Sequence, residues 1–176
     1  MEEAAAPGTR SRLRTLIPST LTAVRLLALP GVITLWLQGS RPAALGLYGL
    51  ILLSDVADGW AARRLDSETT FGAFFDVLTD TAIVLGLLIM CSCCHVVPVW
   101  IPAVPFAVAG VFLATSIGSA PRYDPLGKYY GTLLFVAIGA LLWGIGSTAT
   151  RVMCALILAA SVAVLARRVI FLLRKE

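Results

Sequence analysis

Apolar residues dominate the chain in long stretches that are separated by short polar breaks. Six windows of about 20 residues follow one another, at 18–38, 43–62, 71–93, 98–118, 126–145 and 152–172. A helix of that length crosses the hydrocarbon core of a bilayer. We therefore predict an all-α, polytopic membrane protein of six transmembrane helices. It has one membrane domain, residues 18–176, preceded by a basic juxtamembrane segment, residues 1–17, which we expect to lie at the membrane interface.

Composition supports this class, because 59% of the 176 residues are hydrophobic and only 14% are charged. Positive residues collect on the cytoplasmic side of membrane proteins. With a cytoplasmic N-terminus and six spans, that side receives eleven of the fourteen Lys and Arg residues: Arg10, Arg12, Arg14, Arg63, Arg64, Arg122, Lys128, Arg167, Arg168, Arg174 and Lys175. Both termini are thus expected in the cytoplasm. The net charge of +4 suits a surface facing anionic membrane lipids and requires no nucleic-acid partner.

Four aspartates stand where the second and third windows meet. Asp55 and Asp58 are three residues apart, and Asp76 and Asp80 are four apart, so each pair projects from one face of a helix. The connection "RRLDSETTF" is short enough to force an antiparallel return. We expect the two pairs to face one another near the cytoplasmic end of the hairpin.

A group of carboxylates at membrane depth needs positive charge beside it. One buried carboxylate costs about 2.5 kcal/mol or more on insertion scales, and four together would repel each other. Pairing with nearby arginines explains the first two aspartates but not Asp76 and Asp80, which lie inside an apolar segment. Carboxylate oxygens are the ligands that Mg²⁺ and Mn²⁺ prefer. The pattern favours one or two such ions.

Small residues and one arginine accompany the aspartates. Gly59 and Ala62 have small side chains that leave the helix surface flat. Gly72 lies one turn before Asp76. Arg63 adds a forked charge suited to phosphate. A metal ion, a flat helix surface and an arginine together suit a nucleotide diphosphate.

These residues resemble the signature of the CDP-alcohol phosphatidyltransferase family, DxxDGxxARx8GxxxDxxxD. All eight fixed positions match: Asp55, Asp58, Gly59, Ala62, Arg63, Gly72, Asp76 and Asp80. The motif covers 26 residues, and six spans with a cytoplasmic motif are also typical of the family. The resemblance implies transfer of a substituted phosphate from a CDP-linked donor, usually CDP-diacylglycerol, to an alcohol, with release of CMP. It further implies a homodimer.

The same resemblance implies a role for each matched residue. Asp55, Asp58 and Asp76 would bind metal, and Asp80 would lie at a second metal and act as general base. The CDP site would be formed by Asp58, Gly59, Ala62, Arg63 and Gly72. General chemistry agrees with these roles, because two cations neutralise a pyrophosphate while a carboxylate accepts the proton of the acceptor alcohol.

Two further segments resemble the family outside the main motif. "IPSTLTAVRLLALP", residues 17–30, is similar to a first-span opening of the type NxxTxxR; it retains Arg25, and Ser19 stands where asparagine is common. Arg25 either faces the site, where it meets phosphate or an aspartate, or extends to the membrane surface. "PRYDPLGKYYGT" resembles a segment of phosphatidylglycerophosphate synthases, which makes Arg122 and Lys128 candidates for binding an acceptor phosphate.

The acceptor alcohol stays open at this stage. Glycerol 3-phosphate is the first choice, followed by inositol phosphate, serine or another head group. A cation transporter or channel is an alternative of another class, and it predicts polar residues along several spans. A membrane scaffold is a third, and it gives no reason for Gly59, Arg63 and Gly72 to stand in register with the carboxylates.

Overall fold

The computed structural model describes residues 24–64, 70–116 and 125–173. Within these ranges, side chains are described except at 58–64, 70–74, 76, 116, 125–126, 128 and 171–173. Every statement below refers to these parts of the chain.

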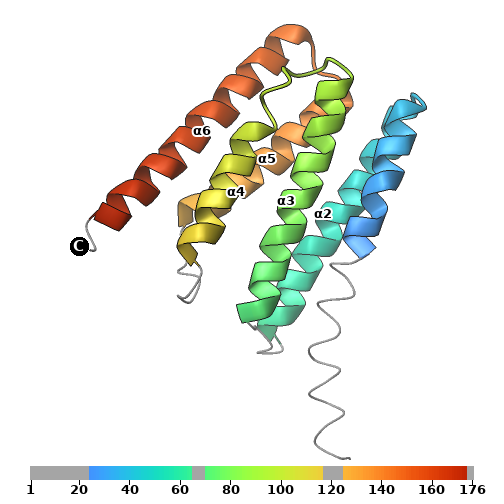
Figure 1. Ribbon diagram of the computed structural model, residues 1–176. Helices are drawn as coiled ribbons and strands as arrows, with labels where there is room; N and C mark the ends of the chain where they lie inside the picture. The colour runs from blue at the N-terminus through green and yellow to red at the C-terminus, as the bar shows by residue number, and fades with distance from the viewer. Residues whose placement is uncertain (1–23, 65–69, 117–124, 174–176) are drawn as a thin grey trace, which may run out of the picture.

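The described chain forms six helices and is all-α, as the sequence predicts. An N-terminal helix is described over Val24–Leu37. It is followed by α2 (Arg41–Arg64), α3 (Thr70–Cys93), α4 (Ala103–Ser116), α5 (Pro125–Trp143) and α6 (Ser147–Leu173). Consecutive helices run in opposite directions (Figure 1). The end of the bundle where α2 finishes and α3 begins is called the site end below, and the opposite end, where α3 finishes and α6 begins, is called the far end.

Helix α5 forms the centre of the bundle, because it packs against α2, α3 and α6. Its residues Ala137, Ile138 and Leu142 are fully buried. Hydrogen bonds between helices reinforce this packing. The Tyr48 hydroxyl of α2 donates to a carbonyl oxygen of α5 at 2.8 Å, and a second tyrosine, Tyr130 of α5, lies 2.8 Å from the Ser161 hydroxyl of α6.

Three helices end in the same hydrogen-bonded turn at the far end. Gly39 and Gly144 have φ angles of 80° and 84°, which glycine adopts without steric cost. Their amides bond to the carbonyls of Trp36 and Leu141 at 3.0 Å. Helix α3 ends likewise, but the left-handed residue is His95, with φ of 56°. The chain therefore turns there at a residue whose side chain makes the left-handed conformation unfavourable.

The start of the fourth helix was predicted wrongly. The apolar window begins at residue 98, whereas α4 begins at Ala103. Residues Pro98 to Pro102 form turns, in which the amide of Ile101 bonds to the carbonyl of Pro98 at 3.0 Å. Proline has no amide hydrogen and is compatible only with a helix's first turn, where Pro105 lies. Hydropathy alone therefore overestimates the length of this helix.

One described helix, Ser147–Ile170 of α6, is long and apolar enough to cross a membrane. Four shorter helical stretches are apolar: Val24–Leu37, Val77–Cys93, Ala103–Thr115 and Tyr129–Trp143. Only 22% of the most apolar part of α6 is buried inside the molecule, and Val152, Val162 and Ile170 are each more than half exposed. An exposed apolar face of this extent requires a partner or a lipid environment.

Candidate active site

Arg25 connects the N-terminal helix to both helices that carry the aspartates. Its residue is 2% exposed, which places it among the buried charged groups of the protein. Its Nη1 donates a hydrogen bond to Oδ1 of Asp55 in α2, and it lies 3.4 Å from Oδ1 of Asp80 in α3. Three helices therefore converge on one guanidinium group. Arg25 faces the aspartates and does not extend to the surface.

The two aspartates differ from the arginine in their access to solvent. The side chains of Asp55 and Asp80 are 34% and 29% exposed, against 3% for Arg25. Because a buried guanidinium stabilises ionised carboxylates beside it, both aspartates can remain charged here. Their partial exposure leaves them accessible to a ligand that approaches from outside the bundle. The site thus combines a fixed cation in the interior with carboxylates at an open edge.

Close helix packing brings Arg25 to this position. A Cβ atom added at Gly86 of α3 would lie 2.9 Å from Cδ2 of Leu29, four residues after Arg25. A Cβ at Gly31 would lie 3.0 Å from Cδ2 of Leu47 in α2. Both distances are shorter than ordinary carbon contacts. The missing side chains let the N-terminal helix lie close against its two neighbours.

The other residues of the motif belong to the same two helices. Asp58, Gly59, Ala62 and Arg63 lie within α2, and Gly72 and Asp76 lie within α3, so their backbone is helical as expected. Their side chains lie outside the described ones. The predicted sharing of one face by Asp55 with Asp58, and by Asp76 with Asp80, follows from helix periodicity. It stays a prediction, as does the complete ligand set for a metal.

The carboxylates that are described have the right chemistry for Mg²⁺ or Mn²⁺, since oxygen donors from two helices converge at one point. Among the described side chains, no group of three or more His, Cys, Asp or Glu residues is placed to hold a metal ion. Asp58 and Asp76, two of the four predicted ligands, are not among the described side chains. Arg122 lies outside the described residues, and the Lys128 side chain of α5 is also not described.

Fold and site together define an all-α protein with an apolar outer surface and a buried arginine paired with carboxylates from two helices. Residues 15–171 match the model of the CDP-alcohol phosphatidyltransferase family. The match covers most of the chain, which therefore belongs to this membrane-bound family.

The individual relatives described here carry the names of two different enzymes. The chain is similar to the CDP-diacylglycerol–glycerol-3-phosphate 3-phosphatidyltransferase of Cereibacter sphaeroides, with 32% identity over 142 residues, 74% of this chain and 64% of that protein. The enzyme of the same name from Escherichia coli is 27% identical over 139 residues, 72% of this chain and 76% of that protein. A cardiolipin synthase (CMP-forming) from rice is 32% identical over 77 residues, 42% of this chain and 23% of that protein.

The residues that position Arg25 were missed by the sequence reasoning. Gly31 and Gly86 are single glycines inside apolar helices, a pattern that signals a possible close approach of two backbones. The pattern does not identify the partner helix. Only the folded arrangement shows that Leu47 and Leu29 fill the space above these two glycines.

Proposed function

We propose that this protein transfers the phosphatidyl group of CDP-diacylglycerol to glycerol 3-phosphate and releases CMP. The observation that carries the proposal is the convergence of Asp55 and Asp80 on Arg25, within a motif whose eight fixed positions are all present. The names of two relatives support glycerol 3-phosphate as the acceptor. Inositol phosphate, serine and a second lipid head group are the acceptors to test against it.

In the proposed reaction, the acceptor hydroxyl oxygen attacks the phosphorus that carries diacylglycerol. A new phosphorus–oxygen bond forms, the bond to the CMP oxygen breaks, and CMP leaves with the electron pair. Asp80 accepts the hydroxyl proton, because its carboxylate lies 3.4 Å from Arg25 and is partly exposed. Two divalent cations, held by Asp55, Asp58, Asp76 and Asp80, would neutralise the pyrophosphate.

Arg25 has a positioning role in this scheme. Its guanidinium holds Oδ1 of Asp55 and lies near Oδ1 of Asp80, which fixes the relative position of α2 and α3 at the site. A fixed separation between a metal ligand and a general base matters, because misplacement by about 1 Å costs as much as a hundredfold in rate. Arg63 and the small residues Gly59, Ala62 and Gly72 would form the CDP site. Arg122 and Lys128 would bind the acceptor phosphate.

The proposed membrane placement puts the site end in the cytoplasm and all six helices in the bilayer. Support comes from the alternating direction of the helices (Figure 1), the apolar outer surface of α6 and the distribution of Lys and Arg. A membrane-impermeant maleimide tests it on whole cells or sealed vesicles. In a background whose four native cysteines are replaced by serine, it should label Ser147→Cys at the far end from outside and Asp66→Cys only after the membrane is opened. The reverse pattern would show the opposite orientation.

A homodimer is also proposed. The resemblance implies it, and a Cβ added at Gly127 or Gly131 of α5 would meet nothing within 4 Å, which leaves an open small-residue surface. Cross-linking in native membranes, compared with Gly131→Leu, measures whether α5 forms the contact. An undiminished dimer in that variant would place the interface elsewhere.

The decisive experiment measures CMP release by purified protein with CDP-diacylglycerol, Mg²⁺ or Mn²⁺, and each acceptor in turn. Asp80→Asn keeps the size of the side chain but removes the base, and Asp66→Asn, in the predicted loop, is the matched control. We expect release with glycerol 3-phosphate, loss of at least a hundredfold in Asp80→Asn, and wild-type activity in Asp66→Asn. Release by Asp80→Asn at the wild-type rate would remove Asp80 from catalysis. Release with another acceptor alone would correct the substrate.

A further inference from the structure

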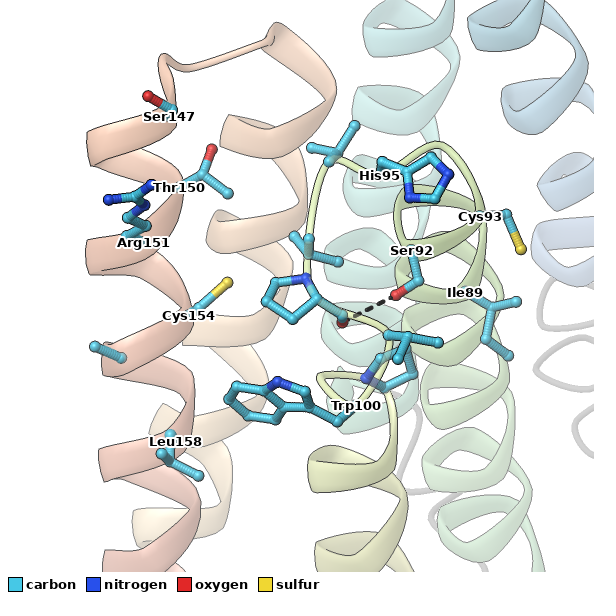
Figure 2. Close-up of a pocket in the computed structure, with 16 residues that line it drawn as sticks. Ile89, Ser92, Cys93, His95, Trp100, Ser147, Thr150, Arg151, Cys154 and Leu158 are labelled. Carbon is cyan, nitrogen blue, oxygen red and sulfur yellow. Dashed lines mark hydrogen bonds between the residues drawn. The ribbon is translucent and has the colours of Figure 1, made fainter.

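A cavity of about 1110 Å³ lies at the far end of the bundle, remote from the paired aspartates. The connection between α3 and α4 forms one wall, and the first turns of α6 form the other (Figure 2). Neither Arg25, Asp55 nor Asp80 lines it. Its volume slightly exceeds the range of about 300–1,000 Å³ that is typical of sites for organic ligands.

Polar and apolar side chains are segregated within this cavity. Ser147, Thr150 and Arg151 lie on the first turns of α6, at the outermost part of the far end (Figure 2). Trp100 and Leu158 lie further from that end, toward the middle of the bundle, and are 50% and 41% exposed (Figure 2). The cavity therefore changes from polar near the far end to apolar nearer the middle, and its apolar part is open at the side. An amphiphile that lies along α6 with its head group at the far end has the same sequence of polarity.

The charge around the mouth is positive. Arg151 is exposed, and no acidic residue is among those that line the cavity. The sequence contains no Asp or Glu between Asp80 and Asp124, or between Asp124 and Glu176. The first turn of α6 adds amide groups, which carry partial positive charge at a helix N-terminus. The mouth thus complements a group that carries negative charge.

From this combination we propose that the cavity binds one anionic phospholipid from the leaflet at the far end. Its phosphate lies at Arg151 and the first turn of α6, and one acyl chain extends along Trp100 and Leu158. The outer face of α6 is apolar, with Val152 55% exposed and Leu156 48% exposed, so the cavity opens beside a surface suited to lipid. This inference rests on the membrane placement proposed above. It does not depend on the transferase reaction.

Two matched variants of α6 distinguish the effect of filling the cavity from the effect of adding a large side chain to the helix surface. Ala155 and Ala159 are both exposed residues of α6, one turn apart, but only Ala155 lines the cavity. Ala155→Phe fills the cavity, and Ala159→Phe places the same ring outside it. Arg41 is a second exposed cation at the far end that does not line the cavity, so Arg41→Gln is the control for Arg151→Gln.

The test uses full-length protein in vesicles that contain equal amounts of phosphatidylglycerol and phosphatidylcholine, each carrying a photoactivatable group on one acyl chain. After illumination, peptide mass spectrometry maps the cross-links. We expect cross-links within residues 96–102 and 150–158, with phosphatidylglycerol favoured about fivefold by the cation. Ala155→Phe should lose them and Ala159→Phe should keep them. Arg151→Gln should lose the preference for phosphatidylglycerol, and Arg151→Lys and Arg41→Gln should keep it.

Cross-links at the site end, within residues 24–30, 54–64 and 70–80, serve as the internal measure of folding and report on the donor site separately. Equal far-end labelling in Ala155→Phe and Ala159→Phe would overturn the proposal, as would an unchanged lipid preference in Arg151→Gln. Cross-links only at the site end would also overturn it. These results leave the proposed transferase function untouched, because CMP release reports on the opposite end of the bundle.

Discussion

Replacing Arg25 by methionine is the sharpest test of how the three helices are held together at the site. Methionine has a similar length and carries no charge, so the variant removes the cation and retains most of the packing. Arg25 is 3% exposed in its side chain, and it contacts Asp55 and Asp80, which are 34% and 29% exposed. The change leaves two carboxylates close together without this cation.

The expected loss of stability follows from these exposures. Removing one partner of a fully buried ion pair costs about 3–5 kcal/mol, because the remaining charge has lost its compensation. Here both carboxylates are about one third exposed, and exposed ion pairs contribute much less. We therefore expect Arg25→Met to lower the free energy of unfolding by about 2 kcal/mol, between the buried and exposed limits.

Unfolding in mixed micelles with increasing dodecyl sulfate, followed by circular dichroism, measures this difference. Arg41→Met is the control, since Arg41 is exposed and surface substitutions usually change stability by less than about 0.5 kcal/mol. Added Mg²⁺ should recover part of the loss if the aspartates bind metal, because the ion then supplies the missing positive charge. A variant as stable as wild type without metal would refute the inference that Arg25 holds α2 and α3 together.

Three other substitutions test the packing. Gly86→Ala should lower the free energy of unfolding by about 1–2 kcal/mol, because the added methyl group overpacks against Leu29. The double variant with Leu29→Ala should lose less stability than the sum of the two single variants, and additive losses would contradict the contact. Tyr48→Phe removes the hydrogen bond to the Phe135 carbonyl and should cost about 0.6 kcal/mol in the same micelle titration; an unchanged midpoint would show that the bond contributes nothing. His95→Gly should raise stability by about 0.5–1 kcal/mol, because glycine relieves the positive φ angle; a lower melting temperature would contradict this.

Helix positions followed from the sequence wherever polar or charged residues mark the ends. The apolar windows at 43–62 and 71–93 correspond to α2 and α3, which extend no more than two residues beyond each window. Proline made the fourth helix shorter than its window. The sixth helix is longer than its window, since it begins at Ser147 and the helix-compatible residues before residue 152 are not apolar enough to signal it.

The site was predictable as chemistry but not as packing. Helical spacing and the cost of burial identified the aspartates. The same reasoning left two orientations for Arg25, one of which faces the site. Which helix lies against the N-terminal helix depends on how Leu29 fits over Gly86. Such a contact depends on the shapes of two surfaces distant in sequence, and a periodic pattern contains no information about it.

The ion pairs of Arg25 also constrain how the chain is made. During synthesis Arg25 leaves the ribosome 30 residues before Asp55 and 55 residues before Asp80. Until then Arg25 has neither partner, and a charged residue within a membrane-spanning segment is unfavourable at the insertion machinery, by up to about 2.5–3.5 kcal/mol at the centre of the segment. We expect the first three helices to enter the bilayer as one unit, with the N-terminal helix retained beside the translocon until α3 has been made.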